Sequence, residues 1–160
     1  MALLSRIKNG ETIELPDGTV VRPEDAIGPT KRGRRIVVLG DTCDSSAISR
    51  FAADCDLLVH EATNAKLSPE DDDKTEEQVE QHTIAHGHST PRMAGRFARS
   101  IGARWLVLTH FSPRYRGDVV ENDASKSKMA QIVQQAKEAF GSDQVTDAYD
   151  FLTLDVKRRT

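Results

Sequence analysis

The sequence of 160 residues has no long apolar run, only two cysteines and little excess of charge. No stretch approaches the roughly 20 apolar residues of a membrane-spanning helix, so we expect no association with a membrane. Two cysteines are too few for a disulfide framework. The net charge of −3 provides no general attraction to nucleic acid. Because Arg6 stands where a signal peptide would continue as an apolar segment, we expect an intracellular protein.

Three short apolar runs predict the strands of a layered α/β protein. The runs are continuous rather than alternating, which is typical of strands covered on both faces. They occupy residues 36–39, 57–59 and 105–108. A Pro-Asp-Gly turn within residues 11–22 predicts a β-hairpin. Later strand candidates are residues 145–146 and 149–156.

Periodic apolar positions predict two amphipathic helices. The first covers residues 90–101 and begins at Ser89-Thr90-Pro91, a good helix start. The second covers residues 129–140 and ends at Gly141. A shorter helix is expected over residues 46–53. Together with the strands, these helices predict an α/β fold.

The length suits a single domain. We therefore expect residues 1–156 to form part of one domain. Residues 64–81 are polar and acidic, which predicts a surface loop or a frayed helix, and residues 157–160 form a basic tail.

Polar residues follow each of the three apolar runs. Asp41 follows the first run, His60 and Glu61 continue the second, and His110 follows the third. The carboxyl ends of parallel strands meet at one edge of a sheet, where ligands bind. Asp41 and His110 are therefore candidate metal ligands. Taken alone, each could equally be structural: Asp41 as a helix cap and His110 in a hydrogen-bonded turn.

Glu61 and His88 are a candidate catalytic pair. A carboxylate can orient an imidazole so that the ring donates a proton to a leaving group. His60 points to the opposite side of an extended strand from Glu61, which predicts a structural role. Two metal ligands do not complete a catalytic zinc site, which usually has three protein ligands. The sequence contains no His-x-His-x-Asp-His segment that would supply the others.

Four segments in this order resemble the ribonuclease Z family of the metallo-β-lactamase fold. The segments are Leu39-Gly40-Asp41-Thr42, Leu58-Val59-His60-Glu61-Ala62-Thr63, His86-Gly87-His88-Ser89-Thr90 and Leu108-Thr109-His110-Phe111-Ser112-Pro113-Arg114-Tyr115. The resemblance covers nearly the whole chain except residues 64–81 and the tail. It implies the C-terminal half of a metallo-β-lactamase-like αββα sandwich.

The resemblance also implies roles for individual residues. Asp41 matches the carboxylate that bridges two zinc ions, and His110 matches the last histidine ligand. His88 and Glu61 match the pair that assists proton transfer to the departing 3′ oxygen. Arg114 matches an arginine near the substrate phosphates, and Ser112 and Tyr115 flank it.

The implied reaction is the removal of the 3′ trailer from precursor tRNA. In the family, a zinc-bound hydroxide cleaves the phosphodiester after the discriminator nucleotide. The complete enzyme is expected to be a homodimer with two zinc ions, located in the cytoplasm and with the nucleus as a second location. We expect this chain alone to bind zinc weakly and to cleave no tRNA, because most of the ligands are missing.

Two other functions fit the same residues. One is a non-catalytic module that binds a full-length subunit or RNA. The other is a different phosphodiesterase of the metallo-β-lactamase fold, against which the His60-Glu61-Ala62-Thr63 segment argues.

Overall fold

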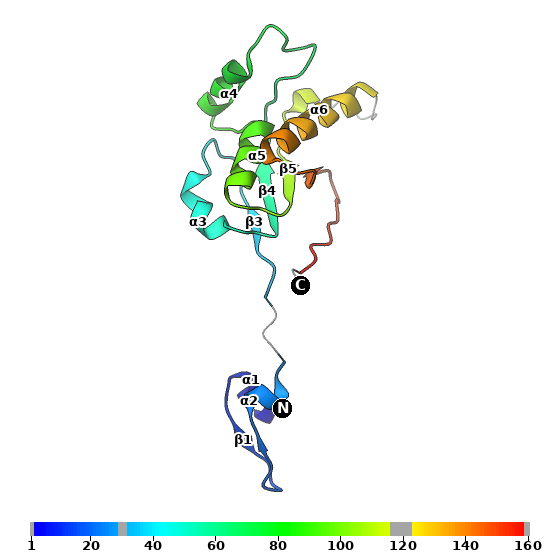
Figure 1. Cartoon of the computed structure of the whole chain (residues 1–160). Helices are drawn as coiled ribbons and strands as arrows, with labels where there is room; N and C mark the ends of the chain where they lie inside the picture. Colours follow the sequence, from blue (N-terminus) through cyan, green and yellow to red (C-terminus); the bar gives the residue numbers. More distant parts are fainter. Residues whose placement is uncertain (1, 29–31, 116–122, 159–160) are drawn as a thin grey trace. The chain divides into compact units, whose positions relative to one another are not determined.

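The computed structural model describes residues 2–28, 32–115 and 123–158. The chain divides into two compact units, Met1–Gly33 and Arg34–Thr160 (Figure 1). The assignment of residues 1–156 to part of one domain stays a prediction.

The smaller unit contains the predicted hairpin. Its elements are α1 (Ala2–Lys8), β1 (Ile13–Glu14), β2 (Val20–Val21) and α2 (Pro23–Ala26). The antiparallel strands are joined by a turn in which Gly18 has a φ of 81°, a conformation that favours glycine. Ile7 on α1 and Ile13 on β1 are buried apolar residues of this unit.

The larger unit is built on a parallel sheet of four strands in the order β3-β4-β5-β6. The strands are β3 (Ile36–Val38), β4 (Leu57–Glu61), β5 (Leu106–Thr109) and β6 (Val145–Asp147). All four fall on predicted strands, so the α/β class and these strands are confirmed.

Helices fill the connections between the strands. A 3₁₀ turn η1 (Ser46–Ile48) and α3 (Ser49–Ala52) follow β3. The helices α4 (Glu76–Ala85) and α5 (Pro91–Ser100) follow β4. The 3₁₀ turn η2 (Pro113–Tyr115) and α6 (Asp123–Phe140) follow β5. The predicted helices over residues 46–53, 90–101 and 129–140 are confirmed, and α6 begins earlier than predicted.

Helices α5 and α6 pack together against the sheet (Figure 1). Their start and stop signals work as predicted: the Thr90 hydroxyl accepts a hydrogen bond from the Met93 N–H at 3.2 Å, and Gly141 ends α6 with a φ of 74°. The two helices and the sheet share one buried apolar cluster. Its members include Leu58, Leu106, Leu108, Ala94, Ala98, Ile132 and Ala136.

The two faces of β3 differ in exposure. Val37 belongs to the apolar cluster, whereas Ile36 and Val38 are 52% and 69% exposed. The prediction of a strand covered on both faces is therefore wrong for β3. Among the described helices of the larger unit, those that pack on the sheet cover the face to which Val37 points, and a continuous apolar run does not reveal which face will be covered.

The segment 64–81 combines the two predicted alternatives, a loop followed by a helix that begins at Glu76. Helix α4 begins within it, and Thr75 and Gln78 each accept a hydrogen bond from the backbone N–H of the other, as in a capping box. Val79 on α4 is buried. Local capping therefore gives a regular helix from residue 76 onward, despite the acidic composition.

The strand candidate at residues 149–156 is wrong. Leu152 donates a backbone hydrogen bond to the Tyr149 carbonyl at 3.1 Å, and Phe151 has a φ of 67°. This turn breaks the extended backbone that a strand needs. None of the helices in the described part of the chain is long and apolar enough to span a bilayer.

Candidate metal centre

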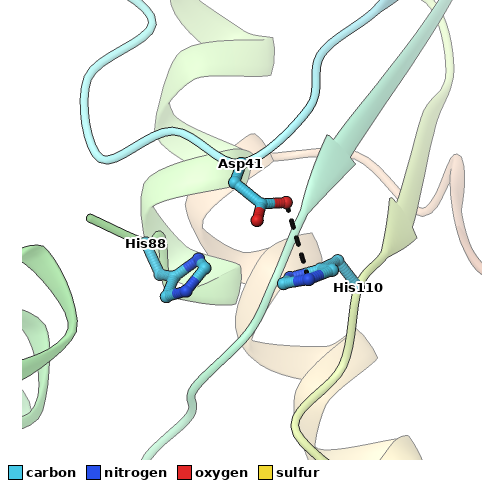
Figure 2. A group of neighbouring side chains, drawn as sticks. All are labelled: Asp41, His88 and His110. Atoms are coloured by element: carbon cyan, nitrogen blue, oxygen red, sulfur yellow. Dashed lines mark ion pairs between the residues drawn. The ribbon is translucent and has the colours of Figure 1, made fainter. Parts of the chain in front are cut away.

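The strand ends bring Asp41, His88 and His110 together. Asp41 follows β3, His110 follows β5, and His88 lies shortly before α5. One ligand-type atom from each residue lies within 4.8 Å of those of the other two. Figure 2 shows the three side chains directed toward a common point. The predicted convergence at the carboxyl edge of the sheet is confirmed.

The group is accessible to solvent, and one of its residues has an unusual backbone conformation. The Oδ1 atom of Asp41 lies 3.5 Å from Nε2 of His110, and their side chains are 57% and 48% exposed (Figure 2). The ring centroids of His88 and His110 are 5.3 Å apart. His110 has a φ of 55°, an unusual value for a residue other than glycine. The fold therefore holds this imidazole in place at a local backbone cost.

Glu61 lies behind the group and is fully buried. Its carboxylate accepts hydrogen bonds from the backbone N–H groups of Thr42 and Ser89, from the Thr63 hydroxyl, and from Nδ1 of His88 at 3.3 Å. Burial by itself raises the pKa of the Glu61 carboxyl, but these hydrogen bonds outweigh it and hold the pKa below its ordinary value. The expected Glu61–His88 contact is therefore present.

His60 is a core residue, as expected from its place on the strand. Its Nδ1 donates to the Glu61 carbonyl at 2.8 Å, and its Nε2 lies 2.9 Å from the Ser45 hydroxyl. Burial lowers the pKa of His60 below its ordinary value, despite the hydrogen bond to that carbonyl. The ring packs against Phe97 of α5. His60 thus supports the strand from the helix side.

The three predicted substrate contacts lie in different surroundings. Arg114 is 44% exposed, and its Nη2 donates to the Ala65 carbonyl at 2.8 Å. Tyr115 is only 2% exposed, and its hydroxyl accepts from the Ala65 N–H. Ser112 is partly exposed, and its N–H donates to the Thr63 carbonyl. In this conformation Tyr115 anchors the loop after β4 and does not face solvent.

Asp71 completes the anchoring of that loop. Its side chain is almost fully buried, lies 2.7 Å from Nζ of Lys74, and accepts from the Leu67 N–H at 3.1 Å. Arg114 lies 3.7 Å away. Burial raises the pKa of Asp71, but Lys74, Leu67 and Arg114 together lower it below its ordinary value. The loop is therefore fixed by a buried charge that Lys74 and Arg114 balance.

Sequence reasoning missed two residues that support the site. Thr63 contacts both Glu61 and His110, and its position two residues after Glu61 was a usable signal, because alternate residues share a side of an extended strand. Asp71 stands in an acidic run that is typical of solvated loops. Its nearest partners, Lys74 and Leu67, are close in the sequence, but their spacing from Asp71 does not indicate that its side chain is buried.

The group fits a metal ion of the zinc type. One carboxylate and two imidazoles are ligand types that zinc accepts. One ligand-type atom of each side chain lies within 4.8 Å of those of the other two, and a buried carboxylate orients one of the rings. The carboxyl edge of this parallel sheet therefore carries a group of side chains that could hold a metal ion.

Comparison with known proteins gives a specific similarity. No profile of a known family matches. The chain is 36% identical to a ribonuclease Z of Bacillus cereus (strain AH187) over 156 residues, which is 98% of this chain and 44% of that protein. It is 37% identical to a ribonuclease Z of Bacillus thuringiensis (strain Al Hakam) over 150 residues, which is 93% of this chain and 42% of that protein. The predicted resemblance is confirmed, and the chain spans less than half the length of these relatives, in their C-terminal part.

Two solved structures are also similar. Human tRNase Z, short form, has a TM-score of 0.48 and 30% identity, covering 86% of this chain and 37% of its own. The metallo-β-lactamase fold protein YhfI of Bacillus subtilis has a TM-score of 0.47 and 20% identity, covering 86% of this chain and 44% of its own.

Proposed function

We propose that this chain forms the C-terminal part of a ribonuclease Z and contributes part of a zinc site that cleaves precursor tRNA. The main support is the convergence of Asp41, His88 and His110 in front of the buried Glu61. The similarity of nearly the whole chain to part of ribonuclease Z supports the reaction class. The substrate and the activity belong to the complete enzyme and are carried over here as proposals.

Asp41 and His110 are the proposed zinc ligands in this chain. Their facing oxygen and nitrogen atoms are 3.5 Å apart, and both side chains are accessible to an incoming ion. Zinc bound there would supply Lewis-acid chemistry that activates water near neutral pH. The carboxylate of Asp41 has two oxygens and could therefore contact two ions, as the proposed site requires.

Glu61 and His88 are proposed to handle the proton of the leaving 3′ oxygen. The Nδ1 atom of His88 faces the Glu61 carboxylate, which leaves Nε2 on the opposite side of the ring. A ring held in this way can donate a proton from Nε2 to an oxygen in front of it. Glu61 is fully buried and cannot itself reach a substrate, so its proposed role is to orient His88.

The half-exposed Arg114 is the proposed contact to the substrate phosphates, with Ser112 beside it. A guanidinium group suits phosphate because it presents several N–H donors in one plane. One Arg114 nitrogen is held by the Ala65 carbonyl, which would fix the side chain before RNA binds. The Arg114 guanidinium lies over the Tyr115 ring, 4.8 Å from the ring centroid. A homodimer is proposed for the complete enzyme.

Cleavage of a 3′-extended tRNA, together with zinc content, tests the proposal. The chain would be assayed alone and after mixing with the N-terminal region of the Bacillus cereus relative, produced as a separate polypeptide. We expect no cleavage by the chain alone and cleavage after the discriminator nucleotide by the mixture. Asp41→Ala should abolish this cleavage, which controls for contaminating nuclease.

The variants separate the assigned roles. His88→Ala should reduce turnover more than zinc content, and a large loss of zinc would make His88 a ligand instead. Cleavage that does not depend on Asp41 would refute the zinc assignment. Binding of tRNA without cleavage in every mixture would favour the non-catalytic module.

A further inference from the structure

The hydroxyl of Thr63 lies between the buried Glu61 and the candidate ligand His110. Its Oγ1 donates to the Glu61 carboxylate and lies 2.8 Å from Nδ1 of His110. It also lies 3.0 Å from the His110 carbonyl oxygen. One side chain therefore touches the ring and the backbone of His110 and the carboxylate behind it.

The number of hydrogens determines the direction of these contacts. A hydroxyl has one hydrogen and two lone pairs. The Glu61 carboxylate and the His110 carbonyl are both acceptors, so they compete for that single hydrogen. The charged carboxylate is the strongest of the acceptors and takes the hydrogen, so none is left for the ring of His110, and the contact requires Nδ1–H to donate to the Thr63 oxygen. The neutral ring then carries its free lone pair on Nε2, the atom that faces Asp41.

We infer that Thr63 is a positioning residue that fixes the His110 ring with Nε2 as its metal-binding atom. The inference rests on the proposed zinc site, because that site gives the ring orientation a function. The hydrogen-bond geometry of the ring does not depend on that proposal. Ligand histidines generally donate their other N–H to an oxygen that sets their orientation. Here that oxygen belongs to a hydroxyl that is itself bound to a buried carboxylate.

The same carboxylate orients the second histidine. Nδ1 of His88 lies 3.3 Å from Oε1 of Glu61, while Thr63 occupies Oε2. Glu61 thus fixes His88 directly and His110 through Thr63. The backbone N–H groups of Thr42 and Ser89 hold the carboxylate itself in place. One buried group consequently sets the free nitrogen of both imidazoles at the site.

Thr63→Val and Thr63→Ser test the inference in the whole chain. Valine has nearly the same shape without the hydroxyl, and serine keeps the hydroxyl. The first readout is the tautomer of His110 in metal-free protein, taken from long-range ¹H–¹⁵N spectra of the neutral rings. The spectra would be assigned with a His110→Gln variant. The second readout is zinc affinity, measured by competition with a chromophoric chelator.

We expect the Nδ1–H tautomer of His110 in the wild-type chain and in Thr63→Ser. Thr63→Val should move the ring toward the Nε2–H tautomer that free histidine favours, and should weaken zinc binding by about 10- to 100-fold. Thr146→Val removes another threonine hydroxyl, bonded to Trp105, and should leave both readouts unchanged. Circular dichroism would confirm that each variant is folded.

An Nε2–H tautomer in the wild-type chain would overturn the inference, and so would an unchanged tautomer in folded Thr63→Val. If Thr63→Val does not fold, the inference is tested by the tautomer of His110 in the wild-type chain and in Thr63→Ala. The tautomer is read without metal or substrate. Its outcome is therefore independent of whether the chain takes part in tRNA cleavage.

Discussion

Gly95→Ala should destabilise the protein although alanine is the better helix former. Gly95 lies in the middle of α5 and is buried against α6. An added Cβ would lie 2.5 Å from the Ala136 carbonyl oxygen and 2.9 Å from the Ala139 Cβ. Neither atom belongs to a flexible side-chain end, so one helix must shift.

The expected size follows from two opposing effects. Overpacking a core costs about 1–3 kcal/mol, and replacing glycine by alanine in a helix gains roughly 0.5–1 kcal/mol. Because the added Cβ would lie 2.5 Å from a backbone oxygen, the overpacking cost should fall in the upper part of its range, about 2–3 kcal/mol, and the net loss should be about 1–2.5 kcal/mol. For a chain of this length, that corresponds to a decrease in Tm of about 2–10 °C.

Urea unfolding followed by circular dichroism measures the effect. Gly33→Ala is the matched control, because a Cβ there meets nothing within 4 Å and its backbone is compatible with alanine. We expect the control to be as stable as the wild type or slightly more stable. Equal or higher stability of Gly95→Ala would refute the reasoning that close helix contact requires glycine.

Three further predictions concern the segment between β4 and α5. Asp71 has a lowered pKa in the folded state, so its stabilisation is present above the pKa of the unfolded chain and is lost as pH falls through the folded pKa. In the Asp71→Asn variant, the free energy of unfolding measured in urea should therefore decrease less steeply than in the wild type as the pH falls below about 4. Tyr115→Phe should cost about 1–3 kcal/mol in urea unfolding, because it leaves the buried Ala65 N–H without its partner. Thr75→Ala should lower amide protection of α4 in hydrogen exchange by about 1 kcal/mol through loss of its cap.

The strands and most helices could be predicted because their signals are local. The apolar runs match β3, β4 and β5 of the parallel sheet, and Thr90-Pro91 marks the start of α5. Helix α4 was predicted only as an alternative to a loop because its surface is mostly polar, although Thr75 and Gln78 form a recognisable capping pair. The exposed face of β3 could not be predicted, since exposure depends on what packs against the strand.

The site could be predicted as a set of positions but not as a network. Asp41, Glu61 and His110 stand at strand ends, so the sheet topology brings them to one edge. The burial of Tyr115 could not be foreseen, because its partner Ala65 reaches it only through the fold of the loop. Distant pairing of this kind leaves no periodic trace in a sequence.

Glu61 makes the separate motifs depend on one another. Its carboxylate binds the N–H of Thr42 after β3 and the N–H of Ser89 before α5, and it also binds Thr63 and His88. Any shift of α5 therefore moves Ser89 relative to Glu61. Since Gly95 determines how closely α5 approaches α6, its substitution should also disturb the orientation of His88. The effects of substitutions at positions 95 and 63 on zinc affinity should consequently be non-additive, although the two residues lie in different elements.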